Sequence, residues 1–234
     1  MRPAPGMLAY IESIRQDCMT RVQKMLCIPT VVMAFVVVLD AGMSAVRAAD
    51  IIADWSSVTV PPPPELNPAT LDGKTTAFLI LDMMKENCGV RPRCPETVPK
   101  VKALMDRARA AGALVAYTLP GGGTIIDPGI APHEGEIVEQ KQGGPDKFLG
   151  TDLDQRLKAR GIKTVIIAGT SAQGVGIGTG SASAQRGYNV IYPVDCVASE
   201  SAFRELYAAW HLGGGGPPVT TKWVTVTRSD MIKF

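Results

Sequence analysis

Two ionisable residues and one glycine-rich stretch stand at the ends of predicted strands in this sequence. Asp82 ends the run TTAFLILD, Lys141 ends GEIVEQK, and GTSAQGVGIGTG (169–180) follows KTVIIA. A carboxylate beside an ammonium group can take a proton from a nucleophile and stabilise the negative charge that develops on a substrate. The start of a glycine-rich helix offers free backbone N–H groups to an anion or a carboxylate. These residues are the first candidates for a chemical site.

Each candidate also has an ordinary structural interpretation. An aspartate at a strand end can cap a helix or pair within the fold, and a lysine there is usually a solvated surface charge. Gly174, Gly178 and Ala182 recur every four residues. Because glycine inside a helix costs about 1 kcal/mol relative to alanine, this pattern indicates a helix that must approach the sheet or a neighbouring subunit closely.

The segments that position these residues alternate between strands and helices. We expect strands at 75–82, 113–119, 135–141, 163–169, 189–195 and 219–227, and helices at 95–112, 151–161, 172–187 and 199–213. This alternation predicts a parallel sheet with helices on both faces, an α/β fold. Ligands of such sheets bind beyond the carboxyl ends of the strands, and all three candidates fall there.

The N-terminal region is typical of a secretory signal. An uncharged apolar run (27–39) follows three basic residues and precedes small residues that end at a predicted cleavage site before Ala49. We therefore expect a signal peptide at 1–48, a proline-rich arm at 49–74 that contains PPPPELNP, and one domain at 75–234, in a periplasmic or secreted protein. A buried helix or an uncleaved signal-anchor is the alternative for the apolar run.

Charge and cysteine usage exclude several classes of protein. Residues 1–48 carry five of the 24 Lys and Arg and three of the 22 Asp and Glu, so the remaining chain has no net charge. We accordingly expect no nucleic-acid partner, and no membrane partner after signal cleavage. Cys88 and Cys94 lie in a loop with little core to bury thiols, which favours a disulfide over two buried thiols. No Cys/His spacing suits a metal, so none is expected.

Four segments in order resemble the isochorismatase-like family of cysteine hydrolases: TAFLILDMMKENC, GEIVEQK, FLGTDLDQRLKARGIKTVIIAGTSAQGVG and GYNVIYPVDCVAS. The resemblance covers most of residues 75–205. It implies a three-layer α/β/α sandwich around a mainly parallel, about six-stranded sheet, a homo-oligomer, and hydrolysis of a small molecule without a cofactor. Members use an Asp, a Lys and a Cys on amides such as nicotinamide or N-carbamoyl compounds, or split a vinyl ether without cysteine chemistry.

The resemblance assigns roles to individual positions. Asp82 matches the family's aspartate. Lys141 matches the family's lysine when the spacing is counted forward from Glu136, but it is displaced by one residue when the spacing is counted back from Phe148. Lys147 is the alternative for this lysine. The family's nucleophilic cysteine falls on Val175, which cannot attack a carbonyl group.

No other residue is a convincing substitute for the cysteine. Ser171 does not form a G-x-S-x-G elbow and has no histidine near it in sequence; it matches a turn that usually carries a cis peptide. Cys196 is better explained as a small buried hydrophobe. Ser171, Gly174 and Gly176 are instead candidates for ligand binding.

Three functional hypotheses follow. The first is a hydrolase in which water attacks the substrate directly, with Asp82 as base and Lys141 as the stabilising cation. The second is a non-catalytic relative that binds a small molecule or has a structural role in the envelope. The third is a dinucleotide-dependent oxidoreductase, which the glycine spacing disfavours because it does not match G-x-G-x-x-G.

Overall fold

The computed structural model describes residues 50–141 and 144–234. The predicted signal peptide therefore lies outside the described residues. The chain divides into two units, residues 1–58 and 59–234. In the first unit the described residues form a short α-helix, α2 (Ile51–Asp54), and a 3-10 turn at Trp55–Ser57. The N-cap of α2, Asp50, accepts a hydrogen bond from the Ile52 N–H. No helix among the described residues has the length and apolarity needed to cross a membrane.

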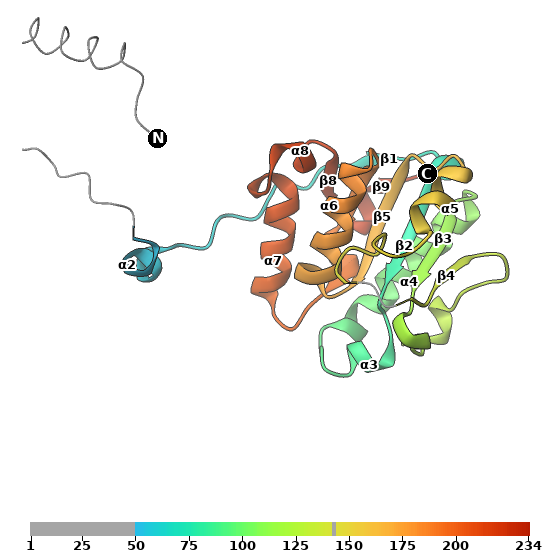
Figure 1. Ribbon diagram of the computed structural model, residues 1–234, viewed down its shortest axis with the longest axis horizontal. Coiled ribbons are helices and arrows are strands. Elements are labelled where there is room, and N and C mark those ends of the chain that lie inside the picture. Colours follow the sequence, from blue (N-terminus) through green and yellow to red (C-terminus); the bar gives the residue numbers. More distant parts are fainter. Residues whose placement is uncertain (1–49, 142–143) are drawn as a thin grey trace, which may run out of the picture. The chain divides into compact units, whose positions relative to one another are not determined.

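The second unit is built around a parallel sheet whose strands lie in the order β4-β3-β2-β5-β6-β8, with the short β7 paired to β5 (Figure 1). Its strands are β2 (Thr76–Leu81), β3 (Leu114–Thr118), β4 (Ile137–Glu139), β5 (Thr164–Thr170), β6 (Asn189–Pro193), β7 (Val197–Ala198) and β8 (Val224–Thr227). Every pairing in this sheet is parallel. The predicted α/β architecture is confirmed.

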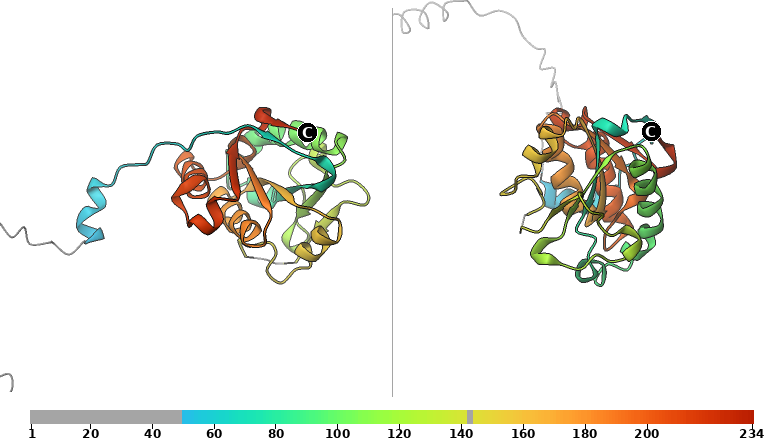
Figure 2. Two further views of the ribbon diagram at one scale, coloured as in Figure 1. Left: turned by 90° about the horizontal axis from the view of Figure 1, so that it is seen from above. Right: turned by 90° about the vertical axis from the view of Figure 1, so that its right-hand side faces the viewer.

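Helices cover both faces of the sheet and make three layers. The helices are α3 (Lys85–Cys88), α4 (Cys94–Ala110), α5 (Leu153–Ala159), α6 (Ile177–Gln185), α7 (Ala202–Trp210) and α8 (Pro218–Thr221). Figure 2 shows α4 on one side of the strands and α6 and α7 on the other. Residues of α5, α6 and α7 pack in one hydrophobic cluster with alternate sheet residues such as Leu79, and residues of α4 pack in a second cluster with their neighbours such as Phe78.

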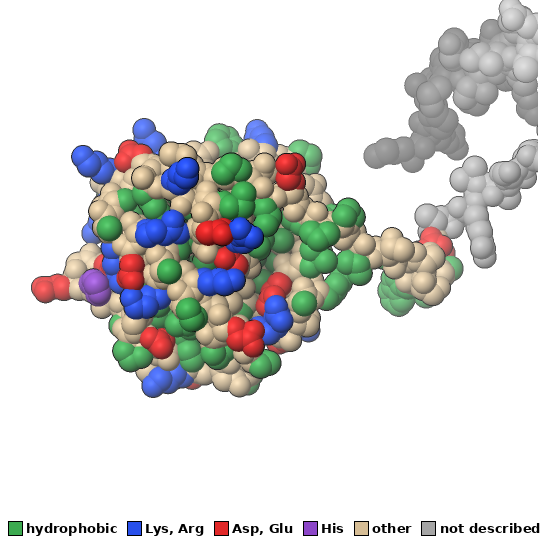
Figure 3. All heavy atoms as spheres, turned by 180° about the vertical axis from the view of Figure 1, so that it is seen from behind, with side chains coloured by type: hydrophobic (Ala, Val, Ile, Leu, Met, Phe, Trp, Pro, Cys, Tyr) green, Lys and Arg blue, Asp and Glu red, His purple; other side chains and the backbone are tan. Residues whose placement is uncertain are grey.

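The central strands are buried on both faces, which explains their apolar sequences. All six residues of β2 are buried, and six of the seven residues of β5 are buried. Strands of this kind carry no alternation of polar and apolar residues, because helices cover both of their faces. The surface that lies behind the view of Figure 1 carries acidic and basic side chains interspersed with one another (Figure 3).

Most predicted elements occur within a few residues of their expected bounds, with one error. The segment expected to form a strand at 219–227 begins as the helix α8, and β8 starts only at Val224. Pro218 at the start of α8 has the fixed φ that suits the first turn of a helix, and Pro217 precedes it. The first residues of the expected strand therefore lie in a helical turn.

The arm and the end of the chain are paired, which the sequence did not indicate. After the prolines, β1 (Ala69–Thr70) pairs in parallel with β9 (Ile232–Lys233). The Leu71 N–H donates to the Lys233 carbonyl at 2.8 Å, and the Asn67 N–H donates to the Val226 carbonyl at 2.9 Å. The second half of the predicted arm is thus attached to the edge of the domain.

Candidate active site

Asp82 follows the last residue of β2 in an uncommon backbone conformation. Its φ is +56°. Asp82 is the only non-glycine residue in the described part of the chain with a positive φ. Aspartate is among the few residues that adopt this region readily, and such residues are frequent at functional sites. The residue as a whole is only 7% exposed.

Hydrogen bonds from two directions hold Asp82 in place. The Thr118 hydroxyl, at the end of β3, donates to Asp82 Oδ1 at 2.6 Å. The Asp82 N–H donates to the Thr118 carbonyl at 3.0 Å, and the Asn87 side-chain amide donates to the Asp82 carbonyl at 3.1 Å. The carboxylate is therefore oriented by its neighbours at the edge of the sheet.

The cation that faces this carboxylate is Lys147. Its Nζ lies 2.7 Å from Asp82 Oδ2, and the two side chains are 4% and 10% exposed. Phe148 is buried beside it, stacked on Tyr188 with ring centroids 6.1 Å apart. Because Phe148 is packed in the core, the adjacent Lys147 also lies inside the domain, at the carboxyl edge of the sheet. It forms a buried ion pair with Asp82 there.

The expected pairing of Asp82 with Lys141 is wrong. Lys141 is exposed and lies beyond the end of β4, which stops at Glu139; its backbone N–H donates to Glu139 Oε1 at 2.8 Å. A residue two positions past the end of the strand no longer follows the sheet, so the alternation that would direct its side chain toward Asp82 is lost. Lys147, the alternative lysine, takes this place.

The glycine-rich stretch forms the turn and helix that follow β5. Gly169 has a φ of +129°, and a β-carbon there would lie 2.0 Å from the Leu81 carbonyl oxygen, so only glycine lets β5 lie this close to β2. The Thr170–Ser171 peptide is cis. A π-helical turn, Ala172–Gly176, then leads into α6.

Val175 lies in this turn, buried at 9% exposure. It joins the same hydrophobic cluster as Leu81 and Phe148, the neighbours of Asp82 and Lys147 in sequence. Its isopropyl group has no lone pair or ionisable proton, so covalent catalysis is excluded at this position. Cys196 is no replacement, because it is fully buried and burial raises the pKa of its thiol far above the ordinary range.

The residues expected to bind a ligand surround Val175 in the same turn. The Ser171 carbonyl accepts hydrogen bonds from the N–H groups of Gly174 and Gly176, both at 3.1 Å. A β-carbon on Gly174 would lie 2.6 Å from the Ser171 Oγ, so the hydroxyl group lies against this glycine. Ligand binding by Ser171, Gly174 and Gly176 stays a prediction.

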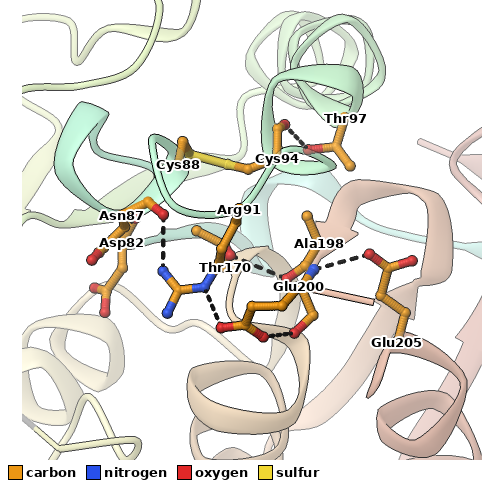
Figure 4. Close-up of a disulfide and its surroundings, with 11 residues drawn as sticks. Asp82, Asn87, Cys88, Arg91, Cys94, Thr97, Thr170, Ala198, Glu200 and Glu205 are labelled. Atoms are coloured by element: carbon orange, nitrogen blue, oxygen red, sulfur yellow. Dashed lines mark hydrogen bonds and ion pairs between the residues drawn. A yellow bond between two sulfur atoms is a disulfide. The ribbon is translucent and has the colours of Figure 1, made fainter. Parts of the chain in front are cut away.

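The predicted disulfide between Cys88 and Cys94 is present, with Cα atoms 5.2 Å apart. The loop that it closes carries Arg91, whose Nε donates to Glu200 Oε1 at 3.0 Å and whose NH1 group donates to the Asn87 carbonyl at 3.0 Å. Figure 4 shows this guanidinium group between Asn87 and Glu200, with Asp82 beside Asn87. The disulfide therefore closes the loop that carries Arg91. Arg91 donates to the Asn87 carbonyl, and the Asn87 side chain donates to the Asp82 carbonyl.

Several of these polar residues were not predicted from the sequence. Thr118 holds the Asp82 carboxylate, and Glu200 connects the disulfide loop to the first turn of the glycine-rich segment through Gln173, whose Nε2 lies 3.2 Å from Glu200 Oε2. The Ser199 hydroxyl donates to Glu200 Oε2 at 2.6 Å. This hydrogen bond is the largest cause of the low pKa of Glu200, which lies well below the usual range of a glutamate. The position of Thr118 at a strand end was the available signal for that residue.

No three His, Cys, Asp or Glu side chains come together as a metal-binding group within residues 50–141 and 144–234. The arrangement that these residues do form is a buried carboxylate–ammonium pair at the carboxyl edge of a parallel sheet, beside a helix start. Such a pair can activate a nucleophile with the carboxylate and stabilise negative charge with the ammonium group. These features define an α/β protein with a candidate site for general acid–base chemistry.

The family is identified by comparison with known proteins. Residues 76–222 match the model of the isochorismatase domain, so the chain belongs to the isochorismatase family. An uncharacterized isochorismatase family protein of Bacillus subtilis, YwoC, is 26% identical over 165 residues, which cover 58% of this chain and 84% of that protein.

Two further similarities are informative. The secreted isochorismatase effector Isc1 of Verticillium dahliae is 26% identical over 145 residues, which cover 56% of this chain and 76% of the effector. The crystal structure of N-carbamoylsarcosine amidase from Thermoplasma acidophilum superposes with a TM-score of 0.56 at 24% identity and covers 67% of this chain and 97% of the amidase. The structural similarity confirms the fold that the resemblance implied.

Proposed function

We propose that this protein hydrolyses a small molecule by direct attack of water, with Asp82 as the base and Lys147 as the stabilising cation. The observation that carries the proposal is the buried ion pair, with 2.7 Å between Lys147 Nζ and Asp82 Oδ2. Removing two charges from water costs several kcal/mol per ion before their attraction is counted. A buried pair of this cost, at the carboxyl edge of a parallel sheet where ligands of such folds bind, supports a role in catalysis.

Each group has a defined part in the reaction. A proton held by Asp82 passes to the terminal carbon of a vinyl ether, and a lone pair of the ether oxygen stabilises the cation that forms at the neighbouring carbon. The Asp82 carboxylate then takes a proton from water while the water oxygen bonds to that carbon, which gives a hemiketal. The carbon–oxygen bond to the leaving group breaks as the hemiketal hydroxyl becomes a carbonyl group; its proton passes to the departing oxygen, whose developing negative charge the Lys147 ammonium group stabilises. Thr118 keeps the carboxylate oriented through the hydrogen bond to its Oδ1.

Val175 supports a route without a covalent intermediate. Amide hydrolysis through a thiolate needs a cysteine at the helix start, and this position holds a hydrocarbon side chain. A vinyl ether needs no such nucleophile, because a carboxyl group can protonate its terminal carbon and then take a proton from the attacking water. The proposal therefore favours vinyl ethers, such as isochorismate, over amides.

The test is turnover of three compounds by the purified protein: isochorismate, nicotinamide and N-carbamoylsarcosine. We expect isochorismate to be hydrolysed and the two amides to be left intact. Asp82→Asn and Lys147→Met are expected to lower kcat/KM by at least about 10²-fold, in line with the loss of a general base or a charge-stabilising group. Lys141→Met is the matched control and keeps full activity. Equal activity of Asp82→Asn and the unmodified protein would refute the proposal.

A second candidate function is binding without catalysis. The observation that favours it is again Val175, since a protein that only binds its ligand needs no nucleophile. In this case the same three compounds are bound, as measured by calorimetry, and recovered unchanged after prolonged incubation.

We also propose that the protein is secreted or periplasmic. The disulfide and the secreted effector among its relatives support this location. N-terminal sequencing of protein recovered outside the cytoplasm is expected to begin at Ala49. The homo-oligomer implied by the resemblance is checked by light scattering.

A further inference from the structure

The first turn of α6 packs directly against the loop that carries Lys147. A β-carbon on Gly178 would lie 2.5 Å from the Pro145 Cβ and 2.7 Å from both its carbonyl carbon and its oxygen. Two of these three atoms belong to the backbone, so they can move aside only if the loop moves. The lack of a side chain at residue 178 therefore determines how closely the loop approaches the helix.

The next residue of the helix is hydrogen-bonded to the same loop. Thr179 is fully buried, and its hydroxyl donates to the Pro145 carbonyl at 2.8 Å and accepts from the Lys147 N–H at 3.2 Å. The hydroxyl thus contacts the backbone on both sides of Asp146. Loss of this group leaves one buried donor and one buried acceptor without partners, which disfavours the present course of the loop.

The far end of α6 holds the loop as well. The Arg186 NH2 group lies 3.3 Å from Asp146 Oδ2, and the guanidinium carbon lies 4.6 Å from the centre of the Phe148 ring. Both residues are neighbours of Lys147. The loop is therefore fixed by α6 at two places, and the hydrogen bond of Thr179 is the one that reaches Lys147 itself.

We propose that Gly178 and Thr179 are positioning residues for the Lys147 ammonium group. Close packing at Gly178 and the hydroxyl bridge at Thr179 fix the backbone of Lys147, from which its side chain reaches Asp82. This inference rests on the proposed function in taking Lys147 as the cation of the site. It gives the glycine-rich stretch a role in catalysis through the loop, although the stretch supplies no nucleophile.

The test compares four variants of the full chain: Gly178→Ala, Thr179→Val, Thr179→Ser and Gly180→Ala. Gly180→Ala is the matched control in the same helix, because a β-carbon there would meet the two Leu212 methyl groups at 3.4 and 3.5 Å, an ordinary contact. Thr179→Ser keeps the hydroxyl group. The readout is the rate at which Lys147 is labelled by reductive methylation, measured by peptide mass spectrometry, with the exposed Lys141 as internal reference.

We expect Lys147 to be labelled several-fold faster in Gly178→Ala and Thr179→Val, because its amine leaves the buried ion pair. Thr179→Ser and Gly180→Ala are expected to label as slowly as the unmodified protein. In isochorismate turnover, the first two variants are expected to lose about 10²-fold in kcat with little change in KM, the scale expected of a displacement near 1 Å. If Gly178→Ala does not fold, the comparison of Thr179→Val with Thr179→Ser decides.

Slow labelling of Lys147 in both Gly178→Ala and Thr179→Val would overturn the inference. Fast labelling that extends to Thr179→Ser, with a matching fall in melting temperature, would also overturn it, because ordinary loss of packing would then be sufficient. Fast labelling confined to the two expected variants supports the inference even if Asp82→Asn keeps full turnover. In that case the proposed function fails and the positioning of Lys147 stands.

Discussion

Replacing Lys147 with methionine is the most direct perturbation of the buried pair. Methionine has a similar length and no charge, so it removes the ammonium group that lies 2.7 Å from Asp82 Oδ2 while filling much of the same space. The carboxylate keeps the hydrogen bond from the Thr118 hydroxyl at 2.6 Å. Its charge, however, is left without a counter-ion at 10% side-chain exposure.

The expected cost follows from the burial of both partners. Removing one partner of a buried ion pair typically costs about 3–5 kcal/mol. The remaining hydrogen bond from Thr118 favours the lower end, about 3 kcal/mol, which corresponds to a fall in melting temperature of about 6–12 °C for a domain of this size. The double variant Asp82→Asn/Lys147→Met leaves no unpaired charge, so it is expected to be more stable than either single variant.

The measurement is urea denaturation of the unmodified protein, the two single variants and the double variant, followed by far-ultraviolet circular dichroism. Lys141→Met serves as the control, and a change within about 0.5 kcal/mol is expected for this exposed residue. The m-values are compared, so that a changed denatured state is not mistaken for a change in stability.

Equal, small effects of Lys147→Met and Lys141→Met would refute a stabilising role of the buried ion pair. Additive effects of Asp82→Asn and Lys147→Met in the double variant would also refute it, because additivity shows that the two side chains do not interact.

Three further predictions concern other parts of the molecule. Val175→Cys is expected to give a thiol that iodoacetamide alkylates faster than Cys196, and to introduce slow nicotinamide hydrolysis; a thiol that stays unreactive contradicts the assignment of this position. Tyr192→Phe is expected to be neutral or stabilising in urea denaturation, because the buried Tyr192 hydroxyl has no hydrogen-bond partner among the described residues, whereas Tyr117→Phe loses the bond to Arg109 and costs about 1–3 kcal/mol. The pKa of Glu200 is lowered in the folded protein, so its ionised form stabilises the fold. This stabilisation is fully present above the pKa of an unfolded glutamate, about 4.3, and is lost as the pH falls below that value. Between about pH 5 and pH 2, Glu200→Gln is therefore expected to lose less stability than the unmodified protein.

The sequence predicted the strands of the sheet well because their apolar runs have no other stable place than between two layers of helices. Asp82 was found for a related reason. A carboxylate directly after a buried strand must have a partner, and the end of a parallel strand is where ligands bind.

The lysine was harder to predict because its position depends on packing rather than on distance along the chain. Lys141 matches the expected spacing, yet β4 ends before it. Lys147 reaches the site through the burial of Phe148 and the contacts with α6, and neither is visible as a pattern of residue types. Arg91 and Glu200 were missed for the same reason, since their contact joins loops that are far apart in sequence.

The pairing of β1 with β9 also determines how the domain responds to mechanical force. A pull on the chain before residue 67 acts along β1 and meets the Asn67–Val226 hydrogen bond and the parallel pair formed with Ile232 and Lys233. When β9 is held on its C-terminal side, the parallel pairing loads these bonds together in shear, and they do not open one by one. The N-terminal partners in these bonds precede Thr76, where β2 begins. Tension on the N-terminal segment is therefore borne at the edge of the domain before it reaches the strand that ends at Asp82.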